Sequence, residues 1–413
     1  MKSCSLLNFP LPRALGCAVA LLASCATTPA ADWLHYRGPT QNGVSDEVDW
    51  AVPRDTAPTL WRAQVGIGTS SVTVSGGRLF TQGHEGDSEI IRCLDASTGR
   101  ELWRHQHKVS LDPNLFEGGS RSTPTLFEGK VYTLSHEGHL LCFDGLQGRL
   151  IWQKHLPREF GGRKPEWGYS GAPLVWDNRL LVDCGGEGSS TLALHPKTGE
   201  ILWRSGSDKP GYAAPCVLPL EGRQILLIFK ADHLVAYDPA TGAEQWRYPW
   251  KTSYDINAAT PLLVGPNRVL ISSGYNAGAA VLEIQGGQPR LLWQNKALRA
   301  HINSPTLAQG AVFGIDGNTG GGNLVCLHPE TGVKRWEEKS VKGGALITAA
   351  GKLLIVSEKG DFVAAEAHPD GFRPLHRQIA LTRRTWAQPT LSEGRLYLRD
   401  NLGELLCLDL RPK

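Results

Sequence analysis

Residues 93–103, CLDASTGRELW, contain the pattern that decides the fold, because the chain repeats this pattern four more times. In each of the five copies a Trp closes the unit, an Asp or His stands eight residues before it, and a Gly stands four residues before it. An Asp carboxylate can accept turn amides and a Gly can adopt a positive φ, so the unit predicts a β-hairpin whose second strand carries the Trp. The five closing residues are Trp103, Trp152, Trp203, Trp246 and Trp336, and weaker copies end at Trp61 and Trp293.

The spacing of these Trp residues predicts the repeat unit. Consecutive members of the series are 42, 49, 51, 43, 47 and 43 residues apart, which is the length of a four-stranded propeller blade. A large ring at a fixed strand position in successive blades is best explained as an anchor between neighbouring blades, and not as a ligand site. The predicted docking residues are Trp103, Trp152, Trp203, Trp246, Trp293 and Trp336.

The predicted fold is therefore all-β: a single eight-bladed propeller of four-stranded antiparallel blades over residues 57–413. The eighth repeat is degenerate around Leu375, and the final repeat, from Trp386 to Leu410, supplies only three strands. We expect the N-terminal strand that carries Trp61 to complete this last blade, because closure leaves no sheet edge unpaired. A seven-bladed ring is the alternative if the region around Leu375 is irregular.

The composition agrees with a large β-protein. The 413 residues are 41% hydrophobic and 20% charged and include 47 Gly and 26 Pro, a balance that favours short strands and tight turns. Of the cysteines, Cys93, Cys142, Cys326 and Cys407 take the same place in different repeats. Equivalent places in different blades are too far apart to bridge, so we expect small buried thiols and not disulfides.

Residues 1–31 are interpreted as an export signal and a tether. A basic segment precedes an apolar run, Ala14 to Ala23, that is too short to span a bilayer. The following Leu22-Ala-Ser-Cys25 resembles the lipobox of bacterial lipoproteins, which predicts lipidation at Cys25; ordinary cleavage before Asp32 is the alternative. Either route predicts an exported protein, located in the periplasm or anchored to a membrane of the cell envelope.

The mature chain carries little net charge. Without Lys2 and Arg13, the charged residues of the signal, the formal charge falls from +3 to +1, which is too small to indicate a nucleic-acid partner. Residues 32–56 form an N-terminal extension ahead of the first predicted strand.

The repeated unit, read at 93–103 and 236–246, resembles the tryptophan-docking motif of the pyrroloquinoline-quinone-binding-like (quinoprotein-like) β-propeller repeat family. That family contains quinoprotein dehydrogenases and BamB-like envelope lipoproteins, and the resemblance covers about residues 57–410. It implies the propeller fold but not an activity. Residues 33–39, WLHYRGP, are similar to an N-terminal signature of exported members of uncharacterised function, which points away from BamB itself.

Three classes of function are compatible with this resemblance. The predicted one is a non-enzymatic, monomeric scaffold or ligand-binding propeller of the envelope, BamB-like in architecture, with an envelope protein or a small ligand as its partner. The alternative is a quinoprotein alcohol or sugar dehydrogenase, for which the resemblance implies pyrroloquinoline quinone, calcium and an Asp base. The chain lacks adjacent cysteines and a Cys-x-x-Cys-His motif, so no cofactor is expected. A hydrolase or lyase has no visible nucleophile motif.

A ligand site is expected where the segments that lead into the innermost strands converge, at one end of the channel. These segments, one of which is Phe116-Glu-Gly-Gly-Ser-Arg121, carry aromatic, Arg, Asp, His and Asn side chains that suit a planar, anionic or polar ligand. The alternative is that they cap strands and fill the channel. The candidate residues are Arg121, Trp167, Tyr169, Tyr212, Asp255, Asn257, His301, Asn303 and Trp386.

No metal site is predicted. His105 and His107 alternate on a probable strand and suit a metal, but the sequence shows no third ligand, so a solvated surface is the default interpretation. The glycine-rich run 316–323 lacks the spaced carboxylates of a calcium loop and is interpreted as a hairpin tip.

Overall fold

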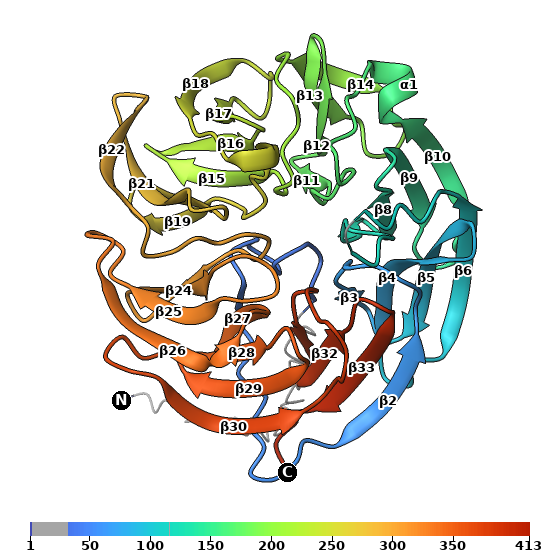
Figure 1. Ribbon diagram of the computed structural model, residues 1–413. Helices are drawn as coiled ribbons and strands as arrows, with labels where there is room; N and C mark the ends of the chain where they lie inside the picture. The colour runs from blue at the N-terminus through green and yellow to red at the C-terminus, as the bar shows by residue number, and fades with distance from the viewer. Residues whose placement is uncertain (2–31, 115) are drawn as a thin grey trace.

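The computed structural model describes Met1, residues 32–114 and residues 116–413. The predicted signal segment and the lipidation site Cys25 lie outside the described residues. Eight sheets are arranged around a central axis, as Figure 1 shows, and the predicted all-β, eight-bladed propeller is confirmed.

Blades 1 to 4 follow one another along the chain. Blade 1 contains β3 (Thr73–Ser75), β4 (Arg78–Glu85), β5 (Ser88–Asp95) and β6 (Glu101–Lys108), and blade 2 contains β7 (Thr125–Phe127), β8 (Lys130–Leu134), β9 (His139–Asp144) and β10 (Leu150–His155). A short helix, α1 (Leu156–Phe160), follows β10. Blade 3 contains β11 (Leu174–Trp176), β12 (Arg179–Gly186), β13 (Ser189–Leu194) and β14 (Ile201–Ser205), and blade 4 contains β15 (Cys216–Leu220), β16 (Arg223–Phe229), β17 (His233–Tyr237) and β18 (Glu244–Pro249).

Blades 5 to 8 complete the ring. After a single 3-10 turn, η1 (Ser253–Asp255), blade 5 contains β19 (Leu262–Gly265), β20 (Arg268–Ser273), β21 (Gly278–Gln285) and β22 (Gln288–Asn295). Blade 6 contains β23 (Thr306–Ala308), β24 (Ala311–Asp316), β25 (Asn323–Leu327) and β26 (Lys334–Lys342). Blade 7 contains β27 (Ala345–Ala349), β28 (Lys352–Val356), β29 (Asp361–Glu366) and β30 (Arg373–Ile379), joined by β1 (Val44–Ser45), and blade 8 contains β31 (Thr390–Ser392), β32 (Arg395–Arg399), β33 (Glu404–Asp409) and β2 (Thr59–Gln64).

The N-terminal strand closes the ring as predicted. Strand β2 pairs antiparallel with β33, with Trp61 opposite Cys407. On the hub side, the buried guanidinium of Arg399 joins blade 8 to blade 1, donating to the carbonyl oxygens of Ser70 (2.7 Å) and Gly66 (2.9 Å). The first and last strands are thus held by a β-ladder and by a buried cationic anchor.

The repeated hairpin has the predicted geometry. The Asp95 carboxylate accepts hydrogen bonds from the amides of Ser97 (2.9 Å) and Thr98 (3.0 Å), and Gly99 has a φ of 72°. The ring of Trp61, from the preceding blade, lies directly on Gly99: a Cβ there would be 2.6 Å from the ring. Gly is therefore required both by its backbone conformation and by the ring that covers it.

The predicted docking residues lie between neighbouring blades. Each indole N–H donates to a carbonyl of the next blade in five pairs, namely Trp103 to Gly145 (3.0 Å), Trp152 to Pro196 (2.9 Å), Trp203 to Pro239 (3.1 Å), Trp293 to Pro329 (2.9 Å) and Trp336 to His368 (3.0 Å). Trp246 is buried in a cluster that also contains Val269 and Leu282 of blade 5.

The degenerate repeat around Leu375 is a regular blade. In β30, His376 occupies the register of the Trp residues, opposite Ala364 and next to the usual bulge, while Leu375 is exposed. This regularity removes the seven-bladed alternative.

The N-terminal extension crosses the hub of the ring, a course that the sequence did not indicate (Figure 1, dark blue). Trp33 pairs with Val74 of blade 1, β1 pairs parallel with β27 of blade 7, and the carboxylate of Glu47 accepts the amides of Glu393 and Gly394 in blade 8. On the opposite side of the ring, Gln41 Nε2 donates to the Pro215 carbonyl beside blade 4 (3.4 Å), so this segment acts as a strap across one end of the channel.

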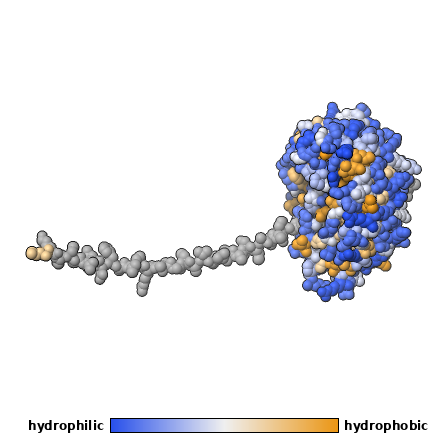
Figure 2. Space-filling view, turned by 90° about the vertical axis from the view of Figure 1, so that its left-hand side faces the viewer, coloured by the Kyte–Doolittle hydropathy of each residue, from blue (hydrophilic) through white to orange (hydrophobic). Residues whose placement is uncertain are grey.

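The predicted state of the cysteines is confirmed: the six within the described residues are buried and form no disulfide. No helix in the described part of the chain is long and apolar enough to cross a membrane. Seen from the side, the surface is largely hydrophilic, with hydrophobic residues in small separate groups (Figure 2).

Candidate functional site

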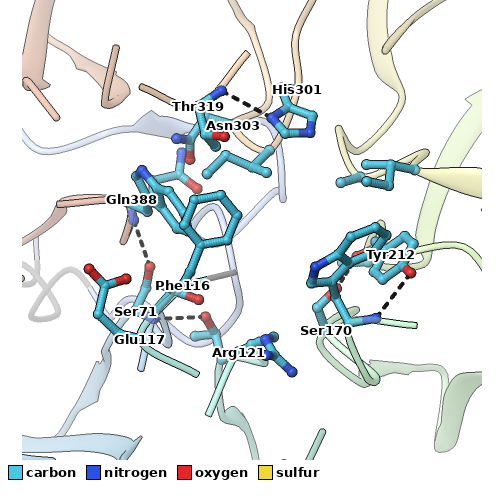
Figure 3. A pocket seen from close by; sticks show the side chains of 18 of the residues that line it. Ser71, Phe116, Glu117, Arg121, Ser170, Tyr212, His301, Asn303, Thr319 and Gln388 are labelled. Carbon is cyan, nitrogen blue, oxygen red and sulfur yellow. Dashed lines mark hydrogen bonds between the residues drawn. The ribbon is translucent and has the colours of Figure 1, made fainter. Parts of the chain in front are cut away.

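A cavity of about 220 Å³ lies at the hub, where the segments that precede the innermost strands meet. Its lining comes from several blades and from the strap, which supplies Tyr36. Figure 3 shows Phe116 in the middle of the view, Tyr212 and Ser170 across the open space from it, and His301 and Arg121 at opposite edges. The cavity therefore offers an apolar interior with polar groups around it, the usual composition of a small-molecule site.

Aromatic rings form the walls of the cavity. Phe116 and Trp386 meet edge to face with centroids 4.7 Å apart, and the Arg384 guanidinium lies 5.4 Å and 5.3 Å from their centroids. Trp167 and Tyr212 form a second pair, with centroids 6.3 Å apart. Ring pairs of this kind present flat apolar surfaces on which a planar ligand can stack.

Four polar atoms of the lining make no hydrogen bond within the part of the chain that the structure describes, although they are buried. They are Nη1 of Arg121, Nε1 of Trp167, Nε2 of His301 and Oε1 of Gln388. Buried polar atoms are normally paired, because leaving one unpaired costs about 1–3 kcal/mol. Their collection around one cavity is typical of a site that receives a polar partner.

The protonation of His301 can be assigned from its contacts. The Thr319 amide donates to Nδ1 at 3.2 Å, and burial lowers the pKa of His301 to about 4. The ring is therefore neutral at neutral pH and carries its proton on Nε2, which makes this atom a donor. Together with Arg121 and Trp167, the lining presents three unpaired N–H donors and one unpaired acceptor.

The lining contains a single carboxylate, Glu117. One of its oxygens accepts from Arg384 (3.0 Å) and the other from the Asn401 amide (3.2 Å). Calcium sites use six to eight oxygen ligands, usually including several carboxylates, so this donor set does not fit a calcium ion. The aromatic walls and N–H donors fit a flat ligand with oxygen acceptors.

Six of the nine predicted site residues line this cavity: Arg121, Trp167, Tyr212, His301, Asn303 and Trp386. The structure places the other three elsewhere. The hydroxyl of Tyr169 donates to the Cys184 carbonyl (2.9 Å), and its ring is part of a core cluster between blades 2 and 3. Asp255 lies outside the lining, 3.9 Å from the Lys209 ammonium.

Asn257, predicted at the channel mouth, is fully buried and tied to the protein. Its amide nitrogen donates to the carbonyls of Lys230 (2.8 Å) and Ala231 (3.1 Å), and its oxygen accepts from the Ser273 hydroxyl (2.7 Å). These bonds use its polar atoms, so Asn257 holds blades 4 and 5 together and has no group free for a ligand.

Several lining residues were not among the candidates. Phe116 and Glu117 belong to a segment that the sequence singled out, and Tyr36 belongs to the run 33–39, whose course across the hub no periodicity reveals. Tyr275 comes from the turn between β20 and β21 and has no sequence signal. Gln388 precedes the Pro that opens β31, where a polar residue looks like an ordinary cap.

The other features singled out in the sequence lie away from this cavity. His107 is partly buried, with Nε2 3.4 Å from a Glu89 oxygen and its ring 5.2 Å from that of His139, so the expected solvated surface is only partly realised. In the described residues, the one group whose potential ligand atoms all lie within 4.8 Å of one another is Asp208, Asp232 and His233. The run 316–323 is the tip of the β24–β25 hairpin, as predicted.

Fold and cavity together define an eight-bladed propeller with a ligand-sized site at its hub. The chain belongs to the family described as outer membrane protein assembly factor BamB, whose model matches residues 86–338. BamB of Shewanella oneidensis is 24% identical over 317 residues, which cover 70% of this chain and 74% of that protein.

Quinone-dependent enzymes show a second similarity, which covers between 28% and 87% of this chain. The dehydrogenase subunit of the alcohol dehydrogenase (quinone) of Gluconobacter oxydans is 29% identical over 124 residues, covering 28% of this chain but only 16% of that protein. The crystal structure of the quinohemoprotein alcohol dehydrogenase from Comamonas testosteroni superposes with a TM-score of 0.68 at 13% identity, covering 93% of this chain and 81% of that one. At this identity the superposition shows a shared fold.

Proposed function

We propose that the protein is a non-enzymatic binding protein of the cell envelope whose hub cavity binds a small, flat, acceptor-rich ligand. The observation that carries the proposal is the set of four unpaired polar atoms facing one aromatic cavity. A flat ligand stacks on the rings, and its oxygen atoms accept from the N–H donors of Arg121, Trp167 and His301.

The architecture supports binding more than catalysis. The only carboxylate of the lining, Glu117, is occupied by Arg384 and Asn401, so it is not available as a general base. The Arg121 guanidinium supplies a positive charge at one edge of the cavity; its Nη1 lies 3.9 Å from an Asp112 carboxylate oxygen, beyond hydrogen-bonding distance. A site with cationic and neutral donors but no free base recognises a ligand without an evident means to transform it.

The cellular setting belongs to the same proposal. We infer export and anchoring through Cys25, because the preceding residues resemble a lipobox and because relatives of this chain are named outer membrane protein assembly factors. An envelope protein is the expected macromolecular partner, and a monomeric propeller is the expected state. Labelling cells with a radioactive fatty acid tests the anchor: the wild-type chain takes up label and a Cys25→Ala variant does not.

A quinoprotein dehydrogenase is the second candidate, favoured by the similarity to quinone-dependent alcohol dehydrogenases. Against it stands the lack of a calcium-type ligand set in the cavity. If the quinone binds, Arg121 and His301 would receive its oxygens and Trp167 its ring, and the group would supply two-electron redox chemistry.

The binding test uses the full chain exported with its own signal. Trp167 and Trp386 line the cavity, so their fluorescence reports occupancy during titration with pyrroloquinoline quinone, with and without calcium, and with benzene tricarboxylate. Saturable quenching is expected, weakened at least tenfold by Arg121→Met and unchanged by Trp176→Phe, a control at the end of β11 whose side chain does not line the cavity.

Two results would overturn this proposal. Quenching that persists unchanged in Arg121→Met would mean that the probes bind elsewhere. Calcium-dependent reduction of a dye with an alcohol or a sugar would replace the binding protein with the dehydrogenase.

A further inference from the structure

Arg37, in the strap, is a buried cation without an acidic partner. Its side chain is only 1% exposed, and no carboxylate in the described part of the chain forms an ion pair with it. Three of its N–H groups donate to main-chain carbonyls: Nε to Gln41 (2.9 Å), and Nη2 to Asn42 (2.7 Å) and Pro305 (2.6 Å). Nη1 is buried and makes no hydrogen bond to the described residues.

The space beside Arg37 is surrounded by hydrogen-bond donors. Gly43 leaves it open: a Cβ on this residue would lie 3.5 Å from Nη2 of Arg37, Nε2 of Gln388 and Oγ1 of Thr306. The Thr306 hydroxyl is buried without a partner, and Gln388 Nε2 uses one of its two hydrogens on the Leu346 carbonyl (3.1 Å). Thr306 and Gln388 thus reach this space with O–H and N–H groups to spare. The Nη2 of Arg37 that also borders it uses both hydrogens on carbonyls, so the free group of Arg37 is Nη1 of the same guanidinium.

This arrangement is unusual among the buried arginines of the hub. Arg399 is equally buried, but its Nη1 donates to three oxygens, of Ser70, Thr81 and Gln82, and Asp400 is its neighbour in the chain. Arg37 has neither a full set of acceptors at Nη1 nor an adjacent acid. Burial lowers the pKa of Arg37 to about 10, so the group remains charged at neutral pH. A buried charge of this kind requires a compensating charge or strong hydrogen bonds.

We propose that the hub binds one monovalent anion of about the size of chloride beside Gly43, held by Nη1 of Arg37, the Thr306 hydroxyl and the Gln388 amide. A small anion supplies the missing negative charge and accepts several hydrogen bonds at once. The site differs from the ligand site proposed above, because Arg37 and Thr306 do not line the cavity; Gln388 lines it, but it would offer the anion Nε2 and not the unpaired Oε1.

The site also explains how the strap is fixed to the blades. Arg37 and Gly43 belong to the strap, Thr306 to blade 6, and Gln388 leads into blade 8. An anion bound to all of them joins three separate parts of the hub through a single centre. Its affinity therefore contributes to the stability of the whole ring by linkage.

The test measures thermal unfolding of the full chain at constant ionic strength while sodium chloride or bromide replaces sodium gluconate. Gluconate is too large for the space beside Gly43. The expected result is a saturable rise in the unfolding temperature, about 3–5 °C at a hundredfold excess over Kd. A Thr306→Val variant removes one hydrogen bond to the ion and is expected to weaken halide binding about tenfold or more.

The control is Thr125→Val. Thr125 occupies the same repeat position in blade 2, opposite Tyr132 as Thr306 is opposite Phe313, but its hydroxyl already donates to the Pro173 carbonyl (2.5 Å). This variant is expected to lose some stability and to keep the full halide response. The comparison separates loss of the ion from general damage to an innermost strand.

Direct placement of the ion comes from anomalous diffraction of crystals grown in bromide, with a peak expected within hydrogen-bonding distance of Arg37. The proposal is overturned if the wild-type protein shows no saturable halide response, if Thr306→Val responds like the wild type, or if no peak lies beside Arg37. Each of these results would mean that water alone solvates the guanidinium.

Discussion

The contact between a docking Trp and a Gly of the next blade, made by Trp61, Trp103, Trp152, Trp203 and Trp293, yields a quantitative prediction. In blade 4, a Cβ on Gly242 would lie 2.5 Å from the ring of Trp203, and Gly242 has a φ of 75°. Gly222, in another turn of the same blade, has almost the same φ of 74° but nothing within 4 Å of its Cβ position. The two glycines therefore have the same backbone conformation, and they differ because a Trp ring covers Gly242 and nothing covers Gly222.

The expected costs follow from this difference. Gly222→Ala should lower the free energy of unfolding by about 1–2 kcal/mol, because Ala disfavours the left-handed conformation. Gly242→Ala has the same conformational cost. It also displaces the Trp203 ring, and this overpacking should cost about 1–3 kcal/mol more. It also strains the hydrogen bond from the indole of Trp203 to the Pro239 carbonyl (3.1 Å), which contributes about 1 kcal/mol. We therefore expect Gly242→Ala to destabilise the protein by about 2–4 kcal/mol more than Gly222→Ala.

The assay is guanidinium unfolding, comparing midpoints of variants with equal slopes. A double-mutant cycle repeats the comparison in a Trp203→Ala variant: once the ring is absent, the extra cost of Gly242→Ala should disappear. Equal costs for the two single variants, or an extra cost that survives the loss of Trp203, would refute the idea that ring docking is what requires Gly in the repeat.

Three further predictions concern buried polar groups. Asn257→Ala leaves the carbonyls of Lys230 and Ala231 without a hydrogen-bond donor and should lower the free energy of unfolding by about 2–4 kcal/mol, measured by thermal unfolding. Asp255 is half-exposed, so Asp255→Ala should change the free energy of unfolding by no more than about 0.5 kcal/mol. Arg399→Met removes the cationic link between blades 8 and 1 and should cost about 3 kcal/mol or more, seen as earlier proteolysis of the terminal strands. Burial raises the pKa of Glu89 to about 7, so this carboxylate takes up a proton in the folded protein first, and the folded state gains stability as the pH falls from 7 to 4.5. Burial lowers the pKa of His107 to about 3, so this ring takes up a proton in the unfolded chain first, and the folded state loses stability as the pH falls below 6.5. Glu89→Gln should therefore lose stability more steeply than the wild type between pH 7 and 4.5, and parallel stability curves for the two proteins would contradict this.

The ring could be predicted because its cause is periodic. The spacing of Trp residues, the Asp or His at the repeated turns and the Gly beneath five of the rings recur in sequence as they do in space. The blade around Leu375 was harder, because His376 replaces the Trp at the docking register and only the backbone pairing identifies it.

The site was predictable only in part because it depends on side-chain direction within irregular segments. Trp167 faces the cavity while Tyr169, two residues later, turns into the core between blades and bonds to Cys184. Neither residue type nor spacing distinguishes the two. The strap presents the same difficulty: Tyr36 and Arg37 reach the hub through a path set by contacts with distant blades, and no local pattern encodes such a path.

The closure of the ring has a consequence for how the protein is made. Arg62 of β2 forms an ion pair with Glu404, 342 residues later, in β33, the strand that β2 must join. The strand that leaves the ribosome first among the blades therefore waits for the last repeat before it gains a partner. Throughout synthesis, β2 and the growing edge of the newest blade remain open to pairing with other chains. A chaperone that shields these two edges until β33 arrives would determine the yield of folded protein.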